Sequence, residues 1–432
     1  MGSVEATGGV SAEPTSPLQI ADFRLYWLAR FAAVMATMAM VVIIGYQVYD
    51  VARTDYAMSV RDASFQLGLL GLFQFVPLAL LTPLAGWVAD RVERRTVAGF
   101  ANSIDMLVAL ALGWFTYSDA LTLPLLFVLA ALHGVARVFV GPSMSAIAPN
   151  IVPTPLLPRA IAMSSIAWQS ASVIGPAVGG FLFAANGALP YWTSAALLLF
   201  ATVTLSLVRP VYPPPAEARR HPLREMADGL SYTWRERFLL GAITLDLFAV
   251  LLAGATAMLP VFARDILLVG PEGLGFLRAA PAVGAAVVAL WLAWRPLKTN
   301  VGMKMLWAVV VFGLGTIGFG LSTSFYLSLA LLVLLGASDM LSVFVRSSLV
   351  QLNTPDAMRG RVSAVSGLAI SASNELGEMQ SGLAAALLGP VGAVVFGGAG
   401  AIGVTALWAW LFPELRRART FEPMFRTKAG VD

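Results

Sequence analysis

Long apolar runs separated by short polar segments dominate the sequence. A helix that crosses a membrane needs about 20 mostly apolar residues, and each run is long enough to supply them. The runs are too long for barrel strands and lack their period-two alternation, so helices are required. We therefore predict an all-α membrane protein with twelve transmembrane helices in two pseudo-symmetric six-helix halves. The first half spans residues 23–47, 67–89, 97–115, 121–147, 161–184 and 191–208, and the second spans 238–262, 274–294, 303–321, 326–350, 362–388 and 391–412.

The amino-acid composition also indicates a membrane protein. Of the 432 residues, 58% are hydrophobic and only 12% are charged, whereas roughly 25% are charged in soluble domains. This excludes an ordinary soluble enzyme. The chain has no cysteine, which excludes disulfides and zinc-thiolate sites, and its two histidines, His133 and His221, argue against a histidine metal cluster. We expect neither a metal nor a cofactor.

Most lysine and arginine residues fall in the connections on one side of the predicted bundle, the side that also holds both termini. Arg91, Arg159, Arg359 and Arg416 are among them. Because basic residues accumulate in cytoplasmic loops, both termini are expected in the cytoplasm. The same bias accounts for the net charge of +4 and the pI near 9.5. We therefore expect a lipid bilayer around the protein and no nucleic-acid partner.

A polar connection divides the chain. It covers residues 209–236 and is rich in prolines near its start, which cannot continue a helix. Leu223, Leu230 and Trp234 follow at helical spacing among arginines, a pattern typical of a helix that lies on an anionic leaflet. A solvated linker is the alternative. The predicted domains are a cytoplasmic tail 1–22, a six-helix half 23–208, the linker 209–236, a six-helix half 237–412 and a cytoplasmic tail 413–432.

The two halves repeat weakly. The segment LAALHGVARVFV at 129–140 is similar to LLGASDMLSVFV at 334–345. An arginine and two glycines also recur at one constant spacing: Arg159, Gly175 and Gly180 in the first half, and Arg361, Gly377 and Gly382 in the second. Internal similarity between two six-helix halves is typical of duplicated transporter folds, whose substrate site lies between the halves near the middle of the membrane.

The connection after the second span reads GWVADRVERR from Gly86 to Arg95. It resembles the loop signature of the major facilitator superfamily, in which a glycine is followed by Asp-Arg and a basic pair; Glu93 stands here where many members have glycine. In physical terms, the glycine would permit close helix approach, and the Asp-Arg pair would engage a neighbouring helix end and latch one conformer. A simple topology anchor is the alternative. The candidate gate residues are Gly86, Asp90, Arg91, Arg94 and Arg95.

The fifth span contains the segment GPAVGG, which resembles the glycine-proline signature of proton-coupled exporters in the same superfamily. Small residues let helices pack closely, and proline removes a backbone hydrogen bond. The segment is therefore a candidate pivot between conformers, with ordinary helix packing as the alternative. The candidate pivot residues are Gly175, Pro176, Gly179 and Gly180.

Other segments narrow the resemblance to one branch of the superfamily. They read HPL at 221–223, FLRAAP at 276–281, TPDAMRGRV at 354–362 and ELRR at 414–417. Together they resemble the bacterial exporter branch that includes enterobactin exporters and macrolide efflux proteins. The resemblance implies a protein of the bacterial inner membrane that exports a small molecule, such as a siderophore or a drug, in exchange for protons. It also implies a monomer.

Acidic residues inside the predicted spans are candidates for carrying the proton, because each charge costs at least about 2.5 kcal/mol at a helix centre and is rarely idle. Glu375 and Glu378 lie three positions apart, so they share a helix face near the middle of a span. They are the leading candidates. A fixed ion pair or hydrogen bond is the alternative for every acid. The proton-coupling candidates are Glu375, Glu378, Asp246, Asp339 and Asp105.

Arginines inside spans could pair with these acids or meet an anionic substrate. There are three arginines for five acids, so two carboxyl groups can remain without a cation. Arg346 lies two turns after Asp339 and is suited to lining the same cavity. Aromatic side chains could stack on a flat substrate, although most aromatic residues in such helices face lipid or core. The substrate-binding candidates are Arg30, Arg137, Arg346, Tyr46, Phe73 and Trp168.

The leading hypothesis is a proton-coupled exporter that works by alternating access. An uncoupled facilitator or a lipid flippase of the same fold is the alternative. An intramembrane enzyme is not expected, because the chain has no cysteine, no His-Glu-x-x-His pattern and no loop large enough for a catalytic domain. A non-transporting sensor would not account for the twofold repeat.

Overall fold

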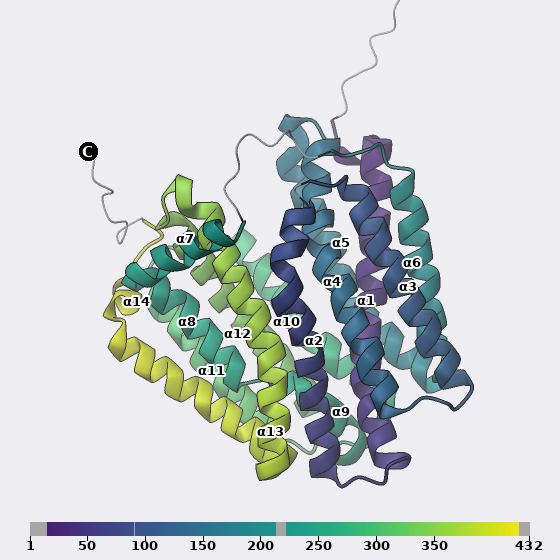
Figure 1. Ribbon diagram of the computed structural model, residues 1–432. Coiled ribbons are helices and arrows are strands. Elements are labelled where there is room, and N and C mark those ends of the chain that lie inside the picture. Colours follow the sequence, from purple (N-terminus) through teal and green to yellow (C-terminus); the bar gives the residue numbers. More distant parts are fainter. Residues whose placement is uncertain (1–14, 90, 213–221, 423–432) are drawn as a thin grey trace, which may run out of the picture.

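The computed structural model describes residues 15–89, 91–212 and 222–422 and shows two bundles of long helices side by side (Figure 1). Helices account for all of the regular structure in these residues. The first half contains α1 Ala21–Thr54, α2 Val60–Ala89, α3 Arg94–Tyr117, α4 Leu123–Ile151, α5 Leu157–Ala185 and α6 Leu189–Ser206. The second half contains α8 Arg237–Leu252, α10 Gly270–Trp294, α11 Val301–Leu321, α12 Phe325–Leu352 and α13 Asp356–Leu411.

The number of spans agrees with the prediction. Within the described residues, 11 helices are long and apolar enough to cross a membrane. The longest of them, α13, is interrupted at Gly389, whose φ of 77° and ψ of 164° are not helical, and Pro390 follows. It therefore supplies two spans, which meet at the boundary expected between residues 388 and 391. The all-helical fold with two six-helix halves is confirmed.

The seventh span differs from the continuous helix predicted over residues 238–262. Helix α8 ends at Leu252, and the chain continues through the 3₁₀ helix η3 Ala255–Met258, the short α9 Leu259–Val261 and the π-helix η4 Phe262–Ile266. The break lies where the backbone passes very close to α13: a Cβ added to Gly254 would lie 2.8 Å from the carbonyl oxygen of Gly377. Broken helices of this kind often line the central site of transporters.

Both ends of the described chain lie at the same end of the bundle (Figure 1). We call this end the terminal face. It also holds α7 Pro222–Arg235 and α14 Pro413–Arg417. The other end, which we call the far face, holds the α1–α2 turn, the α9 region and the bend within α13. Every long helix therefore runs between the two faces.

Helix α7 forms part of the linker and packs on α13, where a Cβ on Gly229 would lie 2.9 Å from the carbonyl oxygen of Arg361. Its opposite side exposes Leu230 and Trp234, with exposed fractions of 54% and 70%. Whether this apolar side rests on lipid stays a prediction. His221, like residues 213–220 and the two tails 1–14 and 423–432, lies outside the described residues.

The two halves meet through glycines placed symmetrically by the repeat. A Cβ on Gly382 of α13 would lie 2.3 Å from the Cα of Gly68 on α2. A Cβ on Gly180 of α5 would lie 2.4 Å from the carbonyl oxygen of Pro271 on α10. Gly180 and Gly382 are the repeat-related pair found in the sequence, so the duplicated segments form the two equivalent contacts between the halves.

Candidate substrate and proton site

A cavity of about 400 Å³ lies between the two halves. Helices α1, α2 and α4 of the first half line it, together with α8, α10, α11, α12, α13 and the broken segment after α8 in the second half. A ligand here would touch elements that move relative to one another in a rocking transporter. The polar residues that line the cavity are Gln74, Arg137, Thr256, Arg278, Asp339, Ser371, Asn374, Glu375 and Glu378.

Arg137 connects the two halves across this cavity. Its Nη1 donates a hydrogen bond of 3.0 Å to Oε1 of Gln74, on α2 of the same half. The same nitrogen lies 3.7 Å from Oε1 of Glu375, on α13 of the other half. The ion pair is long and partly exposed, so a change of charge on Glu375 would be felt directly by the first half.

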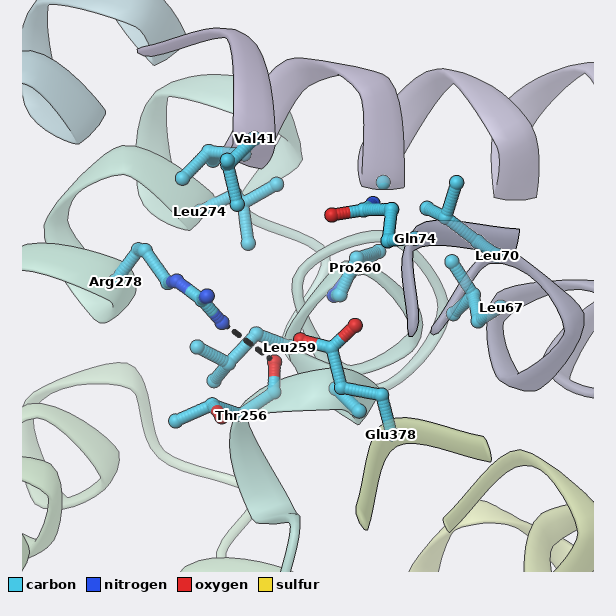
Figure 2. A pocket seen from close by; sticks show the side chains of 13 residues that line it. Val41, Leu67, Leu70, Gln74, Thr256, Leu259, Pro260, Leu274, Arg278 and Glu378 are labelled. Atoms are coloured by element: carbon cyan, nitrogen blue, oxygen red, sulfur yellow. Dashed lines mark hydrogen bonds between the residues drawn. The ribbon is translucent and has the colours of Figure 1, made fainter. Parts of the chain in front are cut away.

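Glu378 lies one turn beyond Glu375 and faces Arg278 (Figure 2). Nη1 of Arg278 donates a hydrogen bond of 3.2 Å to the carbonyl oxygen of Thr256, in the broken segment of the seventh span. The backbone around Glu378 also touches the first half, because a Cβ on Gly71 would lie 2.7 Å from the Cβ of Glu378. The two glutamates therefore line one cavity, and both adjoin the boundary between halves.

Asp246 and Arg346 form an ion pair between α8 and α12. Arg346 is almost completely buried, with an exposed fraction of 3%. Arg346 therefore shows the alternative left open for arginines inside spans, pairing with an acid, and it lines neither the central cavity nor the cavity within the first half. The partner comes from another helix, which sequence spacing cannot show. Asp339 does line the central cavity. Of the five acids predicted within spans, Asp339 and Glu378 are the two for which the described residues supply no ion pair.

A second cavity, of about 260 Å³, lies within the first half and is lined by Arg30, Asp105, Arg137 and Trp168. Asp105 is held by His133, with 2.6 Å between Oδ1 and Nδ1, and both side chains are buried. Arg30 donates a hydrogen bond of 3.1 Å to the hydroxyl of Tyr26. Because Arg137 lines both cavities, the two spaces adjoin at its side chain.

The three aromatic candidates for substrate binding differ in whether they line a cavity. Trp168 lines the second cavity. Tyr46 and Phe73 line neither of these two cavities, and a role for them in substrate binding stays a prediction. Tyr46 is buried against Phe183 with 5.5 Å between ring centroids, and Phe73 stacks on Phe127 at 4.9 Å. Both rings are thus used in helix packing.

Arg278 and Gln74 are two of the polar cavity residues that were not among the sequence-based candidates. Arg278 lies within the predicted span 274–294, and a charge inside a span is itself a signal. Gln74 is a polar residue in the span 67–89, but uncharged side chains in spans are too common to stand out. Among the described residues, no group of three histidine, cysteine, aspartate or glutamate side chains could hold a metal ion.

The candidate gate loop makes different contacts from those expected. A Cβ on Gly86 would meet nothing within 4 Å, so this glycine allows no close helix approach here. Asp90 lies outside the described residues, and Arg91 stacks over the ring of Trp87 at 4.7 Å. The basic pair engages the helix ends instead: Arg94 donates to the carbonyl of Ala146 on α4, and Arg95 to the carbonyl of Ser206 on α6.

Glu93, the residue that departs from the family signature, ties this loop together. Its carboxylate accepts hydrogen bonds from the hydroxyl of Thr96 and from the backbone N–H of Val211, and it pairs with Arg95 at 3.1 Å. Partial burial acts to raise the pKa of Glu93, but these hydrogen bonds and the charge of Arg95 outweigh it and lower the pKa below its ordinary value. The carboxylate therefore stays ionised and holds the loop to the segment that follows α6.

The candidate pivot residues lie at two helix contacts. Cβ atoms on Gly175 and Gly179 would lie 2.7 Å and 3.1 Å from Met35 and Ala39 of α1, within the same half. Gly180 meets α10 of the other half, and a Cβ on Gly275 of α10 would lie 2.9 Å from the carbonyl oxygen of Pro176. The segment thus holds α5 between its own half and the opposite one.

A cluster of charged residues, which we call the far-face clasp, joins the halves at the far face. It consists of Tyr49, Asp50 and Arg53 on α1 and Arg264 and Asp265 on η4. Arg264 Nη1 lies 2.7 Å from Asp50 Oδ1, and Arg53 Nε lies 3.5 Å from Asp265 Oδ2. The Tyr49 hydroxyl donates to the same Asp265 carboxylate. The sequence analysis assigned no role to these residues.

Comparison with known proteins identifies the family. The sequence model of the Major Facilitator Superfamily matches residues 26–378. The chain belongs to this superfamily. Its fold agrees: a bacterial homologue of the human lysosomal transporter Spinster superposes with a TM-score of 0.69 at 14% identity over 95% of this chain and 99% of that one. The xylose transporter XylE of E. coli gives 0.66 at 12% identity, over 90% and 96%. This superfamily member is therefore a multi-pass membrane transporter.

The chain is also similar to exporters. The enterobactin exporter EntS of Escherichia coli O157:H7 (strain EC4115 / EHEC) is 26% identical over 408 residues, which cover 94% of this chain and 96% of that protein. This likeness agrees with the exporter branch recognised from the sequence motifs.

Proposed function

We propose that this superfamily member is a proton-coupled exporter that moves a small molecule, such as a siderophore or a drug, out of the cytoplasm. One observation carries the proposal: Glu375 and Glu378 share a helix face in the cavity between the halves, and Glu375 reaches Arg137 of the other half. Proton binding at this place would change the interaction between the two moving bodies. The likeness to enterobactin exporters supports the direction of transport.

The proposed cycle uses alternating access in a bacterial cytoplasmic membrane, with the terminal face in the cytoplasm and a single chain as the working unit. The far-face clasp and the glycine contacts close one end of the bundle in this structure. In the proposed exchange the proton would reach Glu375 while the far face is open, where the neutral carboxyl no longer attracts Arg137. It would be lost to the cytoplasm in the far-closed state seen here, in which the ionised carboxylate pairs with Arg137.

The proton carrier can be tested in everted membrane vesicles with a proton-sensitive dye. We expect the double variant Glu375→Gln, Glu378→Gln to lose substrate-dependent proton movement, because neither amide can carry a proton. Asp119→Asn is the matched control, since this exposed loop acid lies in a left-handed conformation that asparagine tolerates. Proton flux that survives in the double variant would exclude these carboxyls as the carrier. Transport without any proton flux in the native protein would indicate an uncoupled facilitator instead.

A further inference from the structure

We infer that the exported molecule is a monovalent organic cation, which replaces one proton at the carboxyl groups of the central cavity. The inference rests on the proposed proton exchange and names its substrate class. It depends on the charges that line the two adjoining cavities, on the position of the broken seventh span and on the sense of the coupling between Arg137 and Glu375.

The side chains that line the central cavity carry one more negative charge than positive charges when all are ionised. The central cavity has three carboxyl groups, Asp339, Glu375 and Glu378, and two arginines, Arg137 and Arg278. When all are ionised the net charge is −1. The second cavity adds Arg30 and Asp105, which cancel, and its Arg137 is already counted. Either one proton or one monovalent cation therefore makes the combined space neutral.

The ionisable side chains beside the two cavities do not supply the missing positive charge. Asp246, which lies beside Asp339 around a small void, is neutralised by Arg346. His133 is buried against Asp105 and lines neither of the two cavities. A buried charge without a counter-charge is costly, so the cavity favours an occupant that supplies one positive charge.

The broken seventh span adds to the negative potential. Helix α8 ends at Leu252, and the residues at and just after its C-terminal end, including Val250, Ala253 and Gly254, line the cavity. A helix C-terminus carries the equivalent of about half a negative charge within its last turn. This end of the cavity is therefore a favourable place for a cation.

The position of Arg137 decides the sign of the coupling. An anion bound to Arg137 would compete with Glu375 for that arginine and would leave Glu375 free to take a proton. Anion and proton would then bind together, which is the wrong sense for an exchanger. A cation bound at Glu375 and Glu378 would instead exclude the proton from the same carboxyl groups. A cation, unlike an anion, therefore makes substrate and proton alternatives at this site.

The cavity also sets the shape of the cation. Val41, Leu78, Phe312 and Leu335 form apolar walls around the charged groups. A dry cavity of about 150 Å³ accommodates benzene, so about 400 Å³ is enough for a molecule with two aromatic rings. An amine or pyridinium with an attached ring fits both the charge and the walls.

The test compares two probes of nearly the same shape and opposite charge, N-methyl-4-phenylpyridinium and biphenyl-4-carboxylate. Each is added to the purified full chain in nanodiscs in weakly buffered solution, and binding and proton release are measured together. We expect the cation to bind and to release up to one proton per molecule bound. The carboxylate should release none. Proton release by the carboxylate, or binding of the cation without proton release, would overturn the inference.

Variants separate this inference from the proposed function. We expect Glu375→Gln, Glu378→Gln to lower cation affinity at least tenfold and to abolish proton release, whereas Asp119→Asn should match the native protein. A carboxylate probe that releases protons through the same glutamates would leave proton exchange standing and exclude the cation. Absence of proton release with both probes, together with probe uptake into proteoliposomes that an uncoupler does not affect, would reject the proposed coupling as well. Absence of cation binding would contradict the charge argument alone.

Discussion

The two ends of the bundle are held together in different ways. At the far face, α1 of the first half is joined to η4 of the second by the far-face clasp, and glycines bring α2 against α13 and α5 against α10. At the terminal face, the ion pairs Arg95–Glu93, Arg209–Asp22 and Arg237–Glu414 each join elements of one half. The far face thus fastens the halves to each other, whereas these terminal-face pairs make each half rigid.

In the proposed alternating-access cycle, this difference identifies which contacts have to change when the far face opens. The glycine contacts have no side chain to rearrange, so they separate as rigid surfaces. The ion pairs of the far-face clasp have to be exchanged for water. The pairs within each half can persist throughout the cycle. Rigid halves joined by a few contacts that can break are the physical requirement for alternating access.

A bulky side chain at a glycine contact between the halves, which should prevent closure of the far face, is expected to have the largest effect on transport. In Gly382→Val, the first added carbon would lie 2.3 Å from the Cα of Gly68, and backbone cannot move aside as a flexible side chain can. We expect transport to fall at least tenfold with the protein still folded. Gly403→Val is the matched control, because a Cβ there meets nothing within 4 Å. Transport assays and melting curves of both variants give the comparison.

A second readout shows whether the loss reflects an open far face. The chain contains no cysteine, so a single pair introduced at Asp50 and Arg264 can be cross-linked without background. We expect the cross-link to form readily in the parent chain and to decrease strongly when Gly382→Val is added. An unchanged cross-link in an inactive variant would mean that the glycine contact does not control closure.

Neutralisation of the far-face clasp should have an intermediate effect. Each partly exposed ion pair contributes roughly 0.2–1 kcal/mol, so Arg264→Gln with Asp265→Asn should shift the equilibrium toward the far-open state by at most about thirtyfold. The charge-reversed pair Asp50→Arg, Arg264→Asp should recover much of the loss. Distances between spin labels on α1 and α10 would report both populations. A double neutralisation that leaves these distances unchanged would remove the clasp from the gating argument.

The sequence predicts the scaffold better than the contacts between its halves. The apolar runs locate every span, and Gly389-Pro390 marks the final turn between spans. The break after Leu252 was not predicted, although Gly254 and Pro260 are helix-breaking residues within the predicted span. The close approach of Gly254 to Gly377 of α13 depends on tertiary packing. Acid positions within spans place Glu375 and Glu378 in a cavity. Partner choice, such as Asp246 with Arg346, depends on tertiary packing that one sequence does not contain.

The smallest effect is expected at Glu93, which stabilises the terminal face of one half. Because its pKa is lowered in the folded state, its contribution is present above the ordinary value of about 4.3 and is lost as the pH falls through the folded-state pKa. Glu93→Gln should therefore cost about 1 kcal/mol at pH 7, and the melting temperatures of variant and native protein should converge toward pH 3. Transport by the folded variant should stay close to native, because the contacts of Glu93 join parts of one half. A gap in melting temperature that does not change with pH would show that the charge of Glu93 is not what holds the loop to the segment after α6.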